Sequence, residues 1–82
     1  DVYDALASPI RREIVALLRR GERPAGSLAE YFQVSQPSLS RHLQVMREAG
    51  LVRQRQKGRQ RLYALNITAL REVERWLKSQ LN

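Results

Sequence analysis

The apolar residues in the first part of the chain recur every three or four positions, which is the spacing of one face of a helix. Ser8 and Pro9 predict a helix start, because serine can cap free backbone N–H groups and proline suits the first helical position. The apolar stripe that follows consists of Ile10, Ile14, Leu17 and Leu18. Gly21 predicts the end of this helix, and apolar residues before Ser8 predict a short separate helix.

A second amphipathic helix is predicted after a short polar link. Its apolar stripe consists of Ala25, Leu28, Ala29 and Phe32. Two starts remain open for it. Ser27 and Glu30 match a capping box that begins at Ser27, whereas the stripe favours a start near Ala25. Only Gln33 and Val34 separate this helix from the next one, so a tight turn joins the two.

The stretch from Gln36 to Ala49 predicts a third helix with an unusual outer face. Ser35 is its predicted cap, Gly50 its predicted end, and its inward stripe is Leu39, Leu43 and Met46. The outward face carries few of the Glu and Lys residues common on solvated helices. The residues there are Gln36, Pro37, Ser38, Ser40, Arg41 and Gln44. Two short helices joined by a tight turn, the second with a polar outer face, describe a helix-turn-helix.

After Gly50 the hydrophobic period changes to two, which indicates strands. The two alternating sets are Val52, Gln54 and Gln56 on one side and Arg53, Arg55 and Lys57 on the other. Gly58 predicts a turn and residues 62–65 a returning strand, giving a two-stranded hairpin with a basic tip. Asn66 predicts the cap of a last helix, whose apolar positions are Ile67, Leu70, Val73, Leu77 and Leu81, with Trp76 beside them.

These elements predict a mainly α fold with a two-stranded β-hairpin wing. The expected order is four helices, two strands and a final helix, in a single domain over residues 1–82. A chain of 82 residues builds only a thin core, and the absence of cysteine excludes disulfides and thiol metal sites. No segment approaches 18 consecutive apolar residues and none resembles a signal peptide, so we expect a soluble intracellular protein.

The net charge of +7 is concentrated in one part of the chain. The charges of residues 1–34 cancel, whereas residues 35–63 carry seven cations and a single acidic residue, Glu48. This concentration indicates a polyanionic partner, because an ordinary solvated face mixes both signs. In the DNA major groove, Gln and Arg can pair with base edges, and short serines let a helix come close. The outer face of residues 36–49 therefore predicts a helix that enters the groove.

The cations of the hairpin, Arg55, Lys57, Arg59 and Arg61, cluster around Gly58. We expect them to contact phosphates or to enter the minor groove. Protection of an edge strand by charge is the alternative, but it does not explain why all four charges have one sign.

The sequence offers no catalytic or metal constellation. His42 is the only histidine, and we expect it to pack or to form a hydrogen bond rather than bind metal. Glu72 and Glu74 point to different sides of a helix, and no serine has a His–Asp pair to activate it. We therefore expect no enzyme, no cofactor and no metal site.

The stretches "ALASPIRREIVALL", "LAEYFQVSQPSLSRHLQVMREAGLV" and "RQKGRQRLYAL" resemble the winged helix-turn-helix of the ArsR (ArsR/SmtB) family of bacterial transcriptional repressors. The resemblance implies a cytoplasmic, nucleoid-associated homodimer that binds an inverted-repeat operator. It also implies that residues 36–49 enter the major groove and that the wing, Arg53–Arg61, lies on the backbone or in the minor groove. The candidate DNA-binding residues are Ser35, Gln36, Pro37, Ser38, Ser40, Arg41, Gln44, Arg55, Lys57, Gly58, Arg59 and Arg61.

The chain departs from that family's pattern in three places. It lacks the cysteines of one class of metal sensors and the His and acidic ligands of another, so it is more similar to metal-independent members, including autorepressors. Gln33 stands where the family commonly has glycine, and a left-handed backbone there would cost about 1–2 kcal/mol.

The last helix is predicted either to complete the core or to form a dimer seam. Its length, about four turns, and the apolar segment near residue 2 favour a dimer made by helices at both chain ends. The candidate interface residues are Val2, Tyr3, Leu6, Leu70, Val73, Trp76, Leu77 and Leu81. A winged-helix module for protein or RNA contacts is the alternative to a DNA-binding repressor, and the effector remains open: a protein, a small molecule or none.

Overall fold

The computed structural model describes all residues from Asp1 to Asn82, and its second helix begins where the sequence predicts. Helix α1 spans Val2–Leu6 and helix α2 spans Pro9–Leu18. The Ser8 hydroxyl accepts a hydrogen bond from the Arg11 backbone N–H at 3.4 Å, and Pro9 occupies the first helical position. The predicted break between the two helices is therefore confirmed.

Helix α3 spans Ala25–Phe32, which answers the question of where it begins. The apolar stripe gave the correct start, and the capping box does not form, because Pro24 occupies the N-cap and no side chain caps the helix. The helix ends at Gln33, whose backbone is left-handed, with φ 53° and ψ 41°. The turn therefore places a non-glycine residue in a conformation that favours glycine.

Helix α4 spans Gln36–Glu48, with Ala49 as its C-cap. The Ser35 hydroxyl accepts a hydrogen bond from the Ser38 backbone N–H at 3.2 Å, as expected for an N-cap. The predicted inward stripe is buried, and Gly50 follows with φ 75°. Both predicted ends of this helix are thus confirmed.

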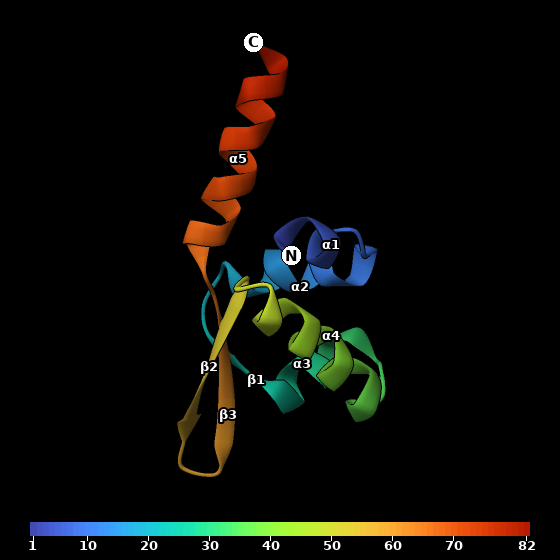
Figure 1. The fold of residues 1–82 in the computed structure, drawn as a ribbon. Coiled ribbons are helices and arrows are strands. Elements are labelled where there is room, and N and C mark those ends of the chain that lie inside the picture. The colour runs from blue at the N-terminus through green and yellow to red at the C-terminus, as the bar shows by residue number, and fades with distance from the viewer.

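The predicted hairpin is present, and a short strand that was not predicted extends it to three strands. Strand β2 spans Val52–Lys57 and β3 spans Gln60–Leu65, with Gly58 in the turn at φ 60°. Strand β1, Arg23–Pro24, pairs antiparallel with the other edge of β3, so the order is β1-β3-β2. Helices α1 to α4 gather on one side of the hairpin, whose tip projects beyond them (Figure 1).

The core joins the first four helices to the base of the hairpin. All of its buried side chains are apolar apart from the phenol of Tyr63. The largest fully buried ones are Ile14, Leu28, Leu39, Leu43, Met46 and Leu51. This core fixes α4 against the base of β2, so the helix and the hairpin are held by one packed unit.

Helix α5, Ile67–Leu81, extends away from the rest of the chain and has no buried residue (Figure 1). Asn66 stands at its N-cap, but the Asn66 side chain donates to the Gly50 carbonyl at 2.7 Å instead of capping the helix. Trp76, Leu77 and Leu81 are each about half exposed or more. No helix in the chain combines the length and apolar character needed to cross a membrane.

Candidate nucleic-acid interface

The outer face of α4 is exposed along its whole length, as the sequence predicts. The exposed residues include every predicted candidate on this helix, namely Gln36, Pro37, Ser38, Ser40, Arg41 and Gln44, together with Ser35 before it. Gln44 donates to the Glu48 carboxylate one turn later, at 3.2 Å. The serine side chains make no hydrogen bond to the rest of the chain other than the Ser35 cap, so most of this face is free to meet a ligand.

The inner edge of α4 is attached to the first two helices through His42. The Arg11 Nη1 atom of α2 lies 3.2 Å from the His42 Nδ1 atom. The Arg11 Nε atom donates to the Ala5 carbonyl of α1 at 2.7 Å. Partial burial lowers the His42 pKa, and the positive charges of Arg11 and Arg41 lower it further. Because arginine can only donate, His42 Nδ1 is the acceptor of this hydrogen bond, and the expectation that His42 packs or forms a hydrogen bond is confirmed.

The two faces of the hairpin carry different groups, because side chains alternate along a strand. Gln54 pairs in register with Tyr63, and Gln56 with Arg61, on the face that meets α4. Arg53, Arg55 and Lys57 lie on the opposite face. The cations of the hairpin therefore do not form one surface, although the sequence grouped them together.

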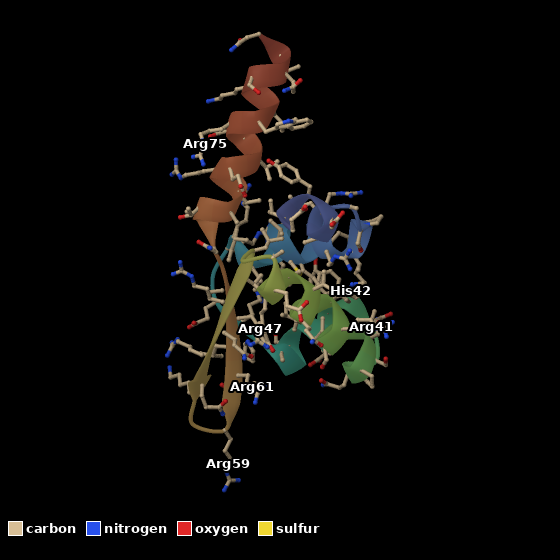
Figure 2. The ribbon with its side chains drawn as sticks, in the orientation of Figure 1. Arg41, His42, Arg47, Arg59, Arg61 and Arg75 are labelled. Carbon is tan, nitrogen blue, oxygen red and sulfur yellow. The ribbon has the colours of Figure 1, made fainter.

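On the face that meets α4, the wing and the helix share a polar groove. The groove is lined by Ser40, Gln44, Arg47, Glu48, Val52, Arg61 and Tyr63. With the Gln54 amide oriented to pair donors with acceptors, its nitrogen donates to the Tyr63 hydroxyl at 3.1 Å. Its oxygen then accepts from both terminal nitrogens of Arg47, at 3.2 and 3.0 Å. Arg47 lies beside the wing in Figure 2, a position that sequence reasoning did not assign to it.

On the opposite face, Arg55 makes a bidentate ion pair with Glu22. Its Nε and Nη2 donate to the two carboxylate oxygens, both at 2.8 Å. The hydrogen bond from Arg55 lowers the Glu22 pKa, and the same bond raises the pKa of Arg55. Arg55, a predicted DNA contact, is thus already paired with a carboxylate of its own chain.

The remaining candidates lie at the free end of the hairpin. Lys57, Gly58, Arg59 and Arg61 are exposed, and Arg59 points away from the body of the molecule (Figure 2). Gln56 donates to the Gly58 carbonyl at 2.9 Å, which supports the turn. The tip therefore presents cations without acidic partners.

The candidate interface residues at the two chain ends differ in exposure. Val2 is buried in the core and offers no surface to a partner, whereas Tyr3 is 42% exposed. Leu6, Leu70 and Val73 are half-buried against the core, and α5 adds the exposed set of Trp76, Leu77 and Leu81. The two ends thus present a mostly apolar surface that the chain itself does not cover.

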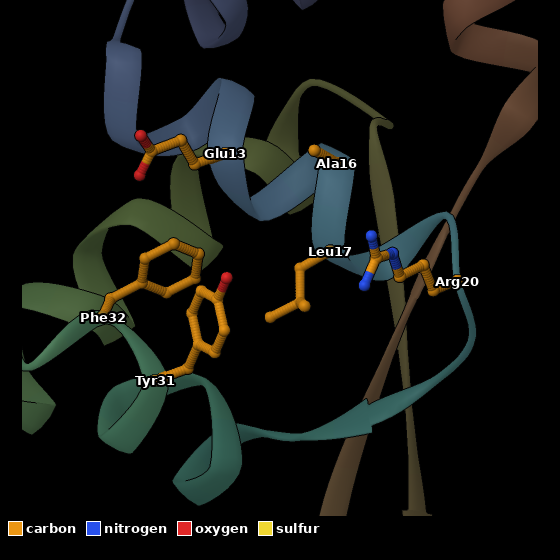
Figure 3. A pocket seen from close by; sticks show the side chains of 6 residues that line it. All are labelled: Glu13, Ala16, Leu17, Arg20, Tyr31 and Phe32. Atoms are coloured by element: carbon orange, nitrogen blue, oxygen red, sulfur yellow. The ribbon is translucent and has the colours of Figure 1, made fainter.

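A hollow of about 290 Å³ lies away from these surfaces, between α2 and α3 (Figure 3). Its lining residues are Glu13, Ala16, Leu17, Arg20, Tyr31 and Phe32. The rings of Tyr31 and Phe32 meet edge to face, and Tyr31 is 65% exposed. No cluster of three or more potential metal ligands occurs in the chain.

Residues 8–54, from the cap of α2 into β2, match the family model described as "Bacterial regulatory protein, arsR family". The chain belongs to this family. It is accordingly an ArsR-family DNA-binding transcriptional repressor, and the family consists of regulators rather than enzymes. ArsR-family repressors bind operator DNA. The predicted family and the predicted role as a DNA-binding transcriptional repressor are thereby confirmed.

Individual relatives agree with this assignment. The transcriptional repressor SdpR of Bacillus subtilis is 37% identical over 82 residues, which cover all of this chain and 91% of SdpR. A crystal structure of a possible transcriptional regulator for arsenical resistance superposes with a TM-score of 0.90 at 38% identity, over all of this chain and 85% of that one. A homodimeric winged helix-turn-helix domain from Mycobacterium bovis superposes with a TM-score of 0.80 at 28% identity. The superposition covers 98% of this chain and 78% of that one. The chain spans between 48% and 69% of the length of several other curated relatives that it matches.

Proposed function

We propose that this repressor binds an inverted-repeat operator as a homodimer, with α4 in the major groove and the wing on the flanking backbone or in the minor groove. The observation that carries the proposal is the pairing of two surfaces at one end of the molecule. The exposed face of α4 holds short hydrogen-bonding side chains, and the adjacent wing tip holds unpaired cations. The face of α4 can read base edges, and the wing tip can neutralise phosphates.

Within this interface the residues have different roles. Gln36, Ser38, Ser40 and Arg41 contact bases or phosphates from the first turns of α4, with Ser35, Pro37 and Gln44 beside them. Lys57, Gly58, Arg59 and Arg61 approach the backbone from the wing. Arg47 lines the same groove as Ser40 and Arg61, but both of its terminal nitrogens donate to Gln54, so it supports the wing and is not one of these contacts.

The dimer is supported by the ends of the chain. Helix α5 has no buried residue, yet its exposed face carries Trp76, Leu77 and Leu81, and α1 places Tyr3 next to it. An apolar surface of this kind on a small domain marks an interaction site. The Mycobacterium bovis relative is itself homodimeric, and a two-fold dimer places two recognition helices about 34 Å apart, one turn of DNA.

A module for protein contacts would need apolar surface on the face of α4 and the wing. The exposed large apolar side chains of this chain are Tyr3, Tyr31, Ile67, Trp76, Leu77 and Leu81. None of them belongs to α4 or to the hairpin, so this face favours nucleic acid.

The experiment that tests the proposal is fluorescence anisotropy of a labelled inverted-repeat duplex from the promoter of the protein's own gene. A random duplex of equal length is the control, and both are titrated across a series of salt concentrations. We expect tighter binding to the promoter, an affinity that falls steeply with salt, and two chains per duplex. Weak and equal binding to both duplexes would contradict the proposal.

A further inference from the structure

Neighbouring residues of β2 connect the wing to the body of the protein on opposite faces. Gln54 contacts Arg47 of α4 and the hydroxyl of Tyr63 on one face. Arg55 pairs with Glu22, the residue before β1, on the other. The contacts with Arg47 and Glu22 join β2 to segments outside the hairpin, so neither is local to the hairpin turn.

These contacts lie where the wing leaves the core. In the register of the hairpin, Gln54 is opposite Tyr63 and Arg55 is opposite Leu62. Tyr63 and Leu62 are both 7% exposed, whereas Gln60, Arg61 and the residues of the turn are exposed. Beyond this level the wing is a two-stranded ribbon, which is only marginally stable on its own and more strongly twisted than a wider sheet. Contacts at residues 54 and 55 are therefore placed to set the direction of the tip.

On its face of the sheet, Arg55 is paired in register with a buried side chain. Leu62 lies between Pro24 and Arg55 in the register, and it is the one buried residue outside the main core cluster. The aliphatic part of an arginine can cover such a side chain while the guanidinium stays in water. Because Glu22 engages two guanidinium nitrogens in parallel, the strongest geometry for such a pair, the Arg55 side chain is held in this place.

We propose that Arg55 is a positioning residue rather than a DNA ligand: its pair with Glu22, together with the Gln54 bridge to Arg47, fixes the angle of the wing to α4. This inference rests on the proposed use of the wing on DNA. It revises the role of Arg55, which the sequence placed among the phosphate contacts.

The substitution Glu22→Gln separates the two roles of Arg55, because they predict opposite signs. It removes a negative charge and frees Arg55, so a DNA-binding Arg55 would raise operator affinity. If Arg55 is a positioning residue, operator affinity should fall by about threefold or more, because a wing that moves freely makes fewer phosphate contacts. Hydroxyl-radical protection of the flanks outside the half-sites should weaken while protection of the half-sites persists.

Three further variants make this test specific. Glu13→Gln removes the same charge from α2, where the exposed carboxylate makes no ion pair and lies away from α4 and the wing, and should leave affinity unchanged or slightly higher. Gln54→Met keeps the side-chain length without the hydrogen bonds and should also lose flank protection. The exchange Glu22→Arg with Arg55→Glu keeps the net charge and should restore affinity and flank protection. Thermal unfolding of each variant verifies the fold.

Two results would overturn the inference, and they are distinguishable. If Lys57→Ala, Arg59→Ala and Arg61→Ala combined leave affinity and flank protection unchanged, the wing does not touch DNA, and both the proposed role of the wing and the positioning role fail. If Arg59→Ala weakens binding but Glu22→Gln strengthens it, the wing binds DNA and Arg55 is one of its ligands, so the positioning role alone fails.

Discussion

The rings of Tyr3 and Trp76 meet edge to face, with centroids 5.9 Å apart and planes at 70°. This contact joins α1 to α5, the two helices at the ends of the chain, and it leaves Tyr3 42% and Trp76 51% exposed. Aromatic pairs of this geometry stabilise by about 0.5–1.5 kcal/mol beyond burial of their area. The pair therefore orients α5 in the single chain while its outer surface stays available to a second copy.

Leu77→Glu tests whether this surface is the dimer interface. Leu77 is 47% exposed in the single chain, so a carboxylate there should leave the monomer folded while placing an unpaired charge inside the dimer. We expect sedimentation velocity to shift toward the monomer and operator affinity to fall by roughly 100-fold, as two linked half-sites are lost.

Ser79→Glu is the matched control, because it lies about 200° around the helix from residue 77. It should sediment as the wild type. A Leu77→Glu protein that remains dimeric and binds its operator normally would place the interface elsewhere.

Arg41→Ala and Arg59→Ala are expected to affect DNA binding differently. Arg41 is exposed on α4, and its removal should cost about 1–3 kcal/mol on the operator while relaxing the choice of sequence. Arg59 is at the wing tip, and its removal should weaken all duplexes alike and reduce the salt slope by about one. Anisotropy on operator and random DNA measures both effects. An equal loss on both duplexes for both variants would refute this division of roles.

Gln33→Gly should stabilise the protein. Gln33 adopts φ 53° and its side chain is exposed, so glycine would relieve the left-handed backbone without removing a packed group. The gain should be about 0.5–1 kcal/mol, part of the strain being offset by the greater freedom of glycine in the unfolded chain. Calorimetry should show a higher Tm for Gln33→Gly but not for Gln33→Ala, which keeps the strain. A lower Tm for the glycine variant would contradict this account of the turn.

Stability should depend on pH through His42. Its pKa is lowered in the folded protein by burial and by the charges of Arg11 and Arg41, so the unfolded chain takes up the proton first. The contribution of neutral His42 to the free energy of unfolding is therefore complete above about pH 6.5, the ordinary pKa of histidine. It declines as the pH falls and levels off below the pKa of His42 in the folded protein. Urea unfolding of wild type and His42→Asn, which keeps an acceptor near Arg11, measures the difference. Identical slopes for the two proteins below pH 6.5 would show that His42 contributes nothing.

Local signals in the sequence were sufficient for most of the fold. The Ser8 and Ser35 caps act on backbone groups three residues ahead, and Gly58 occupies a turn that needs positive φ, so short windows contain the whole cause. The strand at Arg23–Pro24 was not predicted, because two residues show no period and proline suits only the edge position that it takes here.

The contacts between distant segments could not be predicted in the same way. Arg55 and Glu22 are 33 residues apart, and only the pairing of β1 with β3 brings the carboxylate to that face. Arg47 and Gln54 meet because the core fixes α4 against the base of the hairpin. Charge composition identified the right region of the chain, but the side on which each cation lies follows from strand register.

The most direct test of the central claim is the dependence of binding on the spacing of the two half-sites. Operator duplexes with the natural inverted repeat, and with five or ten base pairs inserted at its centre, are titrated with the protein. We expect two chains to bind tightly to the duplex with the natural spacing. Binding affinity should fall strongly with five inserted base pairs, because they turn one half-site to the opposite side of the duplex. Affinity independent of spacing, or one chain per duplex at saturation, would contradict a dimer that places its two α4 helices in successive major grooves.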